Sequence, residues 1–384
     1  MRWRTGAATA AAITLLLLGA GGTAQAEGSR FTPVPLPPAG GTLLGGVSVG
    51  PHTTWAYGVR VTQVPGSKAR RTTPLLFSGD GHGWREVALP AFDGESRITA
   101  AAVVPGDPDD GWIVGDEVDS LGGVLTEHWD GSSWRIVTAP LPDAARGGGL
   151  LSVSARAADD VWGVGWAEIT DSETPTPGKP GGTTVVSHFE ALVEHWDGTA
   201  WQQTAVPDAA HVNLSSVTAL GPRDVMLGGY NGDDQPLILH YDKYGWKSAA
   251  LPATGLNGEV YQLGTDRDGV LWATGRTLLD PDDLGHALVL RRVGGAWRQV
   301  PVPAAAGRLY GFTATPGGIT TVGDTTVLRW AAGHWTSLPL PSVPDGAGFW
   351  LDAALASHGT LTVLGGTLPA STDIPEPYAL TTRL

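Results

Sequence analysis

Short alternating runs of apolar residues, bounded by glycine, proline and aspartate, fill most of the chain. The stretch Ala191–Pro207 shows the unit: Leu192–Trp196 predicts a strand, residues 197–200 reverse the chain, and Trp201 opens a second strand. Pro207 ends that strand because proline has no N–H to give to a sheet. Similar hairpins recur along the chain, which indicates a repeat protein.

Seven copies of the hairpin align on the aromatic residue after the turn. These residues are Phe31, Trp84, Trp134, Trp201, Trp246, Trp297 and Trp335. Two further strands are predicted upstream of each hairpin, the second seen most clearly as Asp160–Gly165. Glycine and proline are abundant, and no helical period is sustained after the first twenty residues, so the sequence predicts an all-β fold built from four-stranded units.

The two ends of the chain complement each other. After Gly365 the last copy offers only a third strand, Ala379–Leu384, which we align with Ala191–Trp196. The missing fourth strand is found at the opposite end, in residues 30–37. A ring explains both observations, whereas an open solenoid with capping repeats explains neither. We therefore predict a seven-bladed β-propeller, closed by pairing of the N-terminal strand with the C-terminal three strands.

With a D-V-W strand and an H-W-D-G-x-x-W hairpin in its units, the chain from residue 29 to 384 resembles secreted bacterial β-propellers. The hairpin is also similar to the Asp-box of sialidases, S/T-x-D-x-G-x-x-W, although Ser78–Trp84 is one residue shorter. The resemblance implies a fold and no particular activity, because propellers host lectins, scaffolds, hydrolases, lyases and oxidases.

The first residues predict export. Arg2 and Arg4 precede an apolar run from Ala7 to Leu18, and Ala24-Gln-Ala26 supplies the small residues of a signal-peptidase site. We expect residues 1–26 to be a signal peptide and residues 27–384 to form one secreted, extracellular domain.

The composition of the chain limits the classes of partner and of chemistry that we expect. The formal charge of −14 disfavours nucleic acid and anionic membranes, and no later segment has the ~20 apolar residues of a membrane span. Without cysteine, disulfides, thiolate catalysis and the cross-linked cofactor of galactose oxidase are excluded. We expect a monomer that needs no cofactor.

Three histidines could suggest a zinc site. His128, His195 and His240 occupy one repeat position, whose other members we align as Ser78, Arg291, Arg329 and Arg383. Equivalent positions in different blades are spread around a ring, so these imidazoles cannot converge on one ion, and we interpret them as structural or surface residues. The aspartates Asp130, Asp197 and Asp242 begin tight turns, where a carboxylate accepts backbone N–H bonds. We expect the repeated tryptophans to pack between blades.

Few residues suggest chemistry directly. Asp107-Pro-Asp-Asp110 and Asp280-Pro-Asp-Asp283 could bind calcium through oxygen ligands, but neither matches a known calcium loop, and solvated acidic loops are the better interpretation. No hydrolase nucleophile motif, zinc-protease motif or nucleotide-binding glycine pattern is present. We therefore predict no catalytic residue and no metal ligand.

The connections that vary most in length indicate where binding occurs, because loops on a rigid scaffold diversify at recognition surfaces. Long second-to-third-strand connections are expected at Val61–Pro74, Ala167–Glu190 and Arg276–His286. In a propeller they share a face with the blade-to-blade connections. On this loop-rich face we place the candidate ligand-binding residues Arg97, Arg146, Arg308, Asp116, Glu117, Asp233, Asp234, Asp282 and Asp283.

Two functions from different classes fit these features. The first is a non-catalytic binding module or scaffold that recognises a glycan, peptide or protein on the loop-rich face. The second is a propeller glycosidase or lyase acting on an acidic carbohydrate, in which Arg97, Arg146 and Arg308 together clamp a carboxylate. Tyr261 close to Glu259 and Tyr310 close to Arg308 resemble parts of a sialidase site, but the sialidase F/Y-R-I-P motif is absent.

Overall fold

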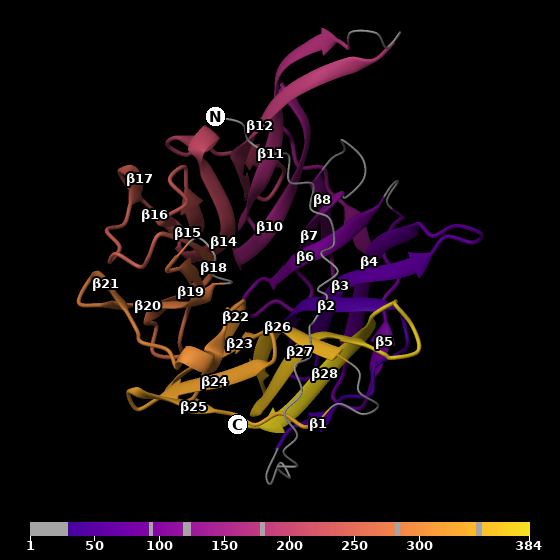
Figure 1. Ribbon diagram of the computed structural model, residues 1–384, viewed down its shortest axis with the longest axis vertical. Coiled ribbons are helices and arrows are strands. Elements are labelled where there is room, and N and C mark those ends of the chain that lie inside the picture. Colours follow the sequence, from indigo (N-terminus) through magenta and orange to yellow (C-terminus); the bar gives the residue numbers. More distant parts are fainter. Residues whose placement is uncertain (1–29, 92–94, 118–123, 177–180, 281–284, 343–347) are drawn as a thin grey trace.

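The computed structural model describes residues 30–91, 95–117, 124–176, 181–280, 285–342 and 348–384. In these ranges the strands form seven four-stranded antiparallel blades around a common centre, with the first strand of each blade innermost (Figure 1). Two of these blades, the second and the third along the chain, are joined into one eight-stranded sheet by pairing of Gly149 with Asp116. The predicted seven-bladed β-propeller is therefore confirmed. The predicted signal peptide, residues 1–26, lies outside the described residues.

The blades follow one another along the chain. Blade 1 holds β2 (Gly41–Ser48), β3 (Thr54–Gln63), β4 (Arg70–Gly79) and β5 (Trp84–Glu86); blade 2 holds β6 (Ser96–Val103), β7 (Gly111–Glu117), β8 (Val124–Trp129) and β9 (Trp134–Ile136). Blade 3 holds β10 (Ala145–Ala157), β11 (Asp160–Pro175), β12 (Thr183–Trp196) and β13 (Trp201–Gln203); blade 4 holds β14 (Val212–Gly221), β15 (Asp224–Asn231), β16 (Pro236–Asp242) and β17 (Gly245–Ser248).

Blade 5 holds β18 (Asn257–Thr265), β19 (Leu271–Leu278), β20 (His286–Val293) and β21 (Ala296–Gln299); blade 6 holds β22 (Gly311–Thr315), β23 (Gly318–Gly323), β24 (Thr326–Ala331) and β25 (His334–Ser337). Blade 7 combines β26 (Gly348–Ser357), β27 (Thr360–Leu368) and β28 (Glu376–Arg383) with β1 (Thr32–Pro33) from the other end of the chain. The two short 3-10 helices of the described ranges, η1 (Ala209–His211) and η2 (Ala304–Ala306), are far too short to cross a membrane.

Closure of the ring rests on β1 and β28. Thr32 lies opposite Thr381 in an antiparallel pair, and Val34 N donates to the carbonyl of Ala379 at 2.9 Å. Phe31 is 5% exposed and packs in the core of blade 7. The sequence therefore predicted correctly that the terminal strands are neighbours.

One detail of the C-terminal alignment was wrong. Thr381, and not Arg383, lies opposite Thr362 at the register position where β12 places His195 opposite Trp162. The error is two residues, which leaves every side chain on the same face of the strand, so the alternation of apolar and polar residues cannot reveal it.

The closure pairing can be tested by cross-linking. We expect cysteines at Thr32 and Thr381 to form a disulfide under mild oxidation, because directly opposed residues of antiparallel strands have Cα atoms ~4.5 to 5.5 Å apart. Non-reducing electrophoresis after proteolysis between the blades checks the bond. Cysteines at Thr32 and Arg383, the pair that the wrong register favours, are the matched control and should cross-link poorly.

A repeated glycine on the second strand fixes how each blade begins. A Cβ added to Gly58, Gly115, Gly165, Gly229, Gly275, Gly323 or Gly365 would lie 1.7–2.1 Å from a carbonyl oxygen of the first strand. Those carbonyls belong to Thr42, Arg97, Gly149, Asn213, Glu259, Arg308 and Trp350. These seven positions are therefore structurally equivalent, and the six of them that carry a side chain place it at the same level of the ring.

Tryptophans fill the spaces between blades, as predicted. Trp134 contacts Trp55 of the preceding blade with ring centroids 4.9 Å apart, and Trp201 contacts Trp112 in the same way at 5.0 Å. On their other face the second-strand indoles stack on a third-strand residue. Trp162 lies 4.3 Å from the ring of His195.

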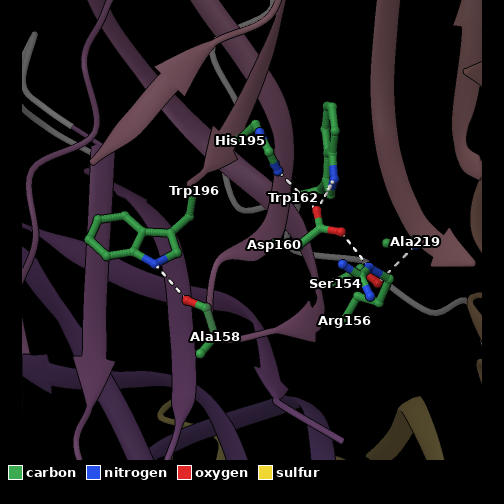
Figure 2. A network of polar contacts seen from close by, with 8 residues as sticks. All are labelled: Ser154, Arg156, Ala158, Asp160, Trp162, His195, Trp196 and Ala219. Carbon is green, nitrogen blue, oxygen red and sulfur yellow. Dashed lines mark hydrogen bonds and ion pairs between the residues drawn. The ribbon is translucent and has the colours of Figure 1, made fainter. Parts of the chain in front are cut away.

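The histidines bind aspartates of their own blades. His195 Nε2 lies 2.9 Å from Asp160 Oδ1, which also accepts a 2.8 Å bond from Trp162 Nε1 (Figure 2). His128 is bonded to Asp110 and His240 to Asp224 in the equivalent way. Each histidine thus joins two strands within one sheet, in agreement with the structural interpretation.

The connection at Ala167–Glu190 differs from the loop that we expected. β11 and β12 continue through it as a two-stranded arm that projects beyond the ring (Figure 1). His188 on this arm lies 2.8 Å from Asp171 and 3.0 Å from Glu190, and the Glu190 hydrogen bond raises the histidine pKa. Val186 and Phe189 are about half exposed. The segment is therefore a strand without a buried face, and its sequence lacks the apolar alternation from which we predict strands.

Candidate ligand-binding site

The predicted arginines each engage a carboxylate of their own blade. Arg97 forms a two-pronged ion pair with Asp116, at 2.8 and 2.9 Å. Arg146 Nη1 lies 3.5 Å from Glu168, and Arg308 Nη2 lies 3.2 Å from Asp324. The glycine register shows that Arg97 and Arg308 are equivalent, whereas Gly149 holds that position in blade 3. Arg146 therefore lies outside the set that the other two belong to.

The other described residues of the predicted set are spread over the same face. Glu117 ends β7, beside Asp116. Asp233 and Asp234 lie between β15 and β16, where Asp233 lines a shallow pocket of about 240 Å³ with His211. Asp282 and Asp283 lie outside the described residues. The described residues of the predicted set thus lie on several blades and do not form one group.

A tighter group of polar residues is found where blades 5, 6 and 7 approach the centre of the ring, at the loop-rich edge of their inner strands. Glu259 and Tyr261 come from β18, Arg276 from β19, Arg308 and Tyr310 from the entry to β22, Asp324 from the end of β23, and Asp352 from β26. We call these seven residues the mouth cluster.

The contacts of Tyr310 and Asp324 in the mouth cluster lie within blade 6 and between blade 6 and its two neighbours. Tyr310 Oη donates to Asp324 Oδ1 at 2.8 Å, and the same oxygen is 3.2 Å from Arg308 Nη2. The rings of Tyr261 and Tyr310 are 5.9 Å apart, which bridges blades 5 and 6. Asp324 also holds blade 7, because its carbonyl accepts a 2.7 Å bond from the N–H of Leu351.

Opposite charges meet at the blade 5 end of the cluster. Glu259 and Arg276 lie directly opposite each other on β18 and β19, with Nε and Oε2 3.9 Å apart. The order of charges is reversed relative to Arg97 and Asp116 in blade 2, since the acid is on the first strand and the base on the second. Blades 2 and 5 therefore both have an ion pair at this position, but the acid and the base exchange strands.

Burial perturbs the acids of the cluster. It raises the pKa of Glu259 to about 7, partly offset by Arg276, and raises the pKa of Asp352 to about 7, with the charge of Asp324 adding to the effect. Burial and the nearby Glu259 raise the pKa of Tyr261 to about 12, and burial together with Asp324 raises that of Tyr310. Asp352 Oδ2 has no hydrogen-bond partner among the described residues. Groups of this kind, near neutrality and close to a surface, are typical of functional sites.

Sequence reasoning found part of this cluster. From the sequence we named Arg308 as a candidate ligand-binding residue, and we named Glu259, Tyr261 and Tyr310 when we considered a sialidase-like enzyme. We did not name Arg276, Asp324 or Asp352. A signal for two of these was present: Arg276 and Asp324 each follow the repeated glycine directly, as Asp116 does. Asp352 follows a buried leucine in the unpatterned stretch 348–353, and only the ring places it near Asp324.

No protein-family model matches this chain, and no curated protein matches it. Solved structures do resemble it. YCF48 bound to D1 peptide superposes with a TM-score of 0.54 and 16% identity over 93% of this chain and 98% of that one. YCF48 from Cyanidioschyzon merolae gives 0.53 and 15% over 92% and 99%. The GH74 xyloglucanase from Xanthomonas campestris gives 0.51 and 14% over 91% of this chain and 55% of that one. At these identities the likeness shows the propeller fold alone.

Proposed function

We propose that this chain is a secreted, non-catalytic binding module that recognises a glycan, peptide or protein segment at the mouth cluster. The observation that carries the proposal is the cluster itself: two tyrosines, two arginines and three acids from three blades, placed at one end of their inner strands. Tyrosine offers a rigid ring and a hydroxyl at low entropic cost, and paired charges offer oriented donors and acceptors.

The scaffold supports this use. Inner strands of neighbouring blades are tied together by side-chain bonds, such as Gln262 accepting from Phe312 N at 2.6 Å and Thr313 accepting from Ala356 N at 3.0 Å. A site built on such strands needs little ordering when a ligand binds, which favours affinity. Recognition of a peptide by this fold is illustrated by YCF48 bound to D1 peptide.

A double substitution tests the proposal. We expect Tyr261→Ala with Tyr310→Ala to abolish binding of the chain to the hits from glycan and peptide arrays, because it removes the rings that bridge blades 5 and 6. Tyr244→Ala is the matched control, since Tyr244 is 74% exposed in the turn between β16 and β17, on the opposite face. Equal loss in both variants, or retained binding in the double variant, would contradict the proposal.

One observation favours the enzyme alternative, an extracellular glycosidase or lyase acting on an acidic carbohydrate. Glu259 and Asp352 both have pKa values raised to about 7, where a carboxyl can act as a general acid, and Tyr261 stands two residues from Glu259. Release of nitrophenol from aryl glycosides of acidic sugars, lost in Glu259→Gln, would select this function over the binding module.

A further inference from the structure

The junction that closes the ring contains a cavity of about 430 Å³, which opens widely to solvent. It lies between blades 7 and 1, on the face opposite the mouth cluster, beside the turns that join β2 to β3 and β26 to β27. Its walls include Trp84 of β5, Thr362 of β27, Thr381 of β28, Pro33 of β1 and the next residue, Val34. Comparison with the other junctions explains why a hollow occurs here.

At three junctions an indole from the second strand of the preceding blade fills this place. Trp55, Trp112 and Trp162 lie 4.9, 5.0 and 6.1 Å from the fourth-strand tryptophan of the next blade. Trp272 holds the same position in blade 5, three residues before the repeated glycine. Trp84 is the fourth-strand tryptophan at the closing junction, and the residue that should meet it is Thr362.

The third strand also has a smaller residue in blade 7. In blades 2, 3 and 5 the second-strand indole is covered by a histidine or arginine, as His128 covers Trp112 at 4.5 Å and Arg291 covers Trp272 at 5.1 Å. Opposite Thr362 stands Thr381, and the two hydroxyls lie 3.5 Å apart. Two small side chains thus replace an indole and its cover, and the volume that they leave is the cavity.

A small residue alone does not produce such a hollow. Blade 6 has Thr320 at the same position, opposite Arg329, yet Thr320 is fully buried, and Phe31, the fourth-strand aromatic residue of that junction, is 5% exposed. In blade 4, Met226 fills the place and packs with Trp297, which is 5% exposed. At the closing junction Trp84 remains only half-buried. Trp246 and Trp335 are buried to a similar degree, but of the fourth-strand tryptophans only Trp84 lines this cavity.

We propose that this cavity is a binding site for an indole ring, held between Trp84 and the two threonines as Trp162 is held between Trp246 and His195. The volume is ample, since roughly 150 Å³ suffices for a benzene ring. Thr360 holds the register position of Asp160, which accepts the indole N–H of Trp162, and Thr360 lines the cavity, so a residue that can accept a hydrogen bond is available there. A tilted aromatic pair gains energy beyond burial of its area.

The indole can come from a small molecule or from a tryptophan side chain of a peptide, and the experiment separates the two. Binding of 5-fluoroindole and of N-acetyl-5-fluorotryptophanamide to the full chain is followed by ¹⁹F NMR, which is blind to the protein's own 16 tryptophans. Saturable binding of the indole alone indicates a small-molecule site, and binding of both indicates that a polypeptide tryptophan is accepted.

Substitutions locate the site. Thr362→Trp places the missing indole inside the protein, so it should weaken binding at least about tenfold, a change of ~1.4 kcal/mol, and raise the melting temperature. Trp84→Ala should weaken binding to the same extent. Trp335→Ala, in the equivalent strand of blade 6 and remote from the cavity, is the control for lost stability and should still bind.

Three outcomes would overturn the inference. They are unchanged binding in Thr362→Trp, a Thr362→Trp chain that melts earlier than the parent chain, as an overpacked core does, and displacement of the fluorine probes by methyl glycosides. Failure of the mouth-cluster substitutions would leave this site untouched, because the two sites share no residue.

Discussion

Replacing Glu127 or Glu194 with leucine is expected to increase the free energy of unfolding by about 3 kcal/mol at pH 7. Both carboxyls are fully buried, neither has a hydrogen-bond partner among the described residues, and burial raises the pKa of each to about 8. At pH 7 the native state must therefore bind a proton that the unfolded state has lost, and each pKa unit costs about 1.4 kcal/mol.

The repeat itself shows that leucine fits. Glu127 and Glu194 each precede the third-strand histidine that lies opposite the second-strand tryptophan of the same blade. The equivalent positions of blades 4, 5 and 6 hold Leu239, Leu290 and Leu328. Those leucines are at most 3% exposed. Substitution therefore changes the polarity of the site at a volume that this fold already accommodates.

The same carboxyls predict a pH dependence. Because their pKa is higher in the folded state than the ~4.5 of the unfolded chain, their favourable contribution is complete below pH 4.5 and is lost as pH rises toward 8. Urea unfolding at pH 5 and pH 8 should show that the parent chain loses about 3 kcal/mol more than Glu194→Leu. Glu173→Leu on the exposed arm is the control, and an equal loss in the parent and Glu194→Leu chains would refute the assignment.

Trp201→Ala is expected to reduce the free energy of unfolding by roughly 3 to 5 kcal/mol, as large aromatic truncations in packed cores do. The indole is 3% exposed and lies 5.0 Å from Trp112 and 6.0 Å from Trp196, so its removal opens the junction between blades 2 and 3. Thermal unfolding followed by near-ultraviolet circular dichroism measures the loss.

Glu173→Ala provides the comparison for this second prediction, because Glu173 is exposed on the projecting arm. It should melt within a degree or two of the parent chain, since surface substitutions of this kind change stability by less than about 0.5 kcal/mol. Equal melting temperatures for the two variants would mean that Trp201 does not stabilise the packing between blades 2 and 3.

The sequence predicted the ring because every blade repeats the same local code. Strand alternation, the aromatic residue after the turn and the aspartate in the turn are local features, and Asp197 does accept the N–H groups of Thr199 and Ala200. The fourth strand missing from one end was identifiable for the same reason. The prediction that failed was the register of the last strand, which was wrong by two residues at Thr381. A shift of two residues keeps the alternation of apolar and polar positions, so the local pattern could not reveal it.

The candidate site was harder to predict because it depends on which blades face one another. Arg97 and Arg146 looked like partners of Arg308, but each binds an acid on its own sheet. Glu259 and Asp352, 93 positions apart in the chain, enter one cluster only through Tyr310 and Asp324 of the blade between them. The cavity at the closing junction could have been found only once the threonines were placed in the tryptophan register.

The pairing of β1 with β28 sets an order on folding. Thr32 and Thr381 are separated by 349 positions, whereas consecutive strands within a blade are only a few positions apart in the chain. Closing so long a loop costs about 2 kcal/mol more than closing one blade's length, so we expect blade 7 to form after the others. During synthesis the first ordered strand has no sheet to join until the last one emerges. Loss of the eight residues of β28 at one terminus therefore also releases the strand at the other.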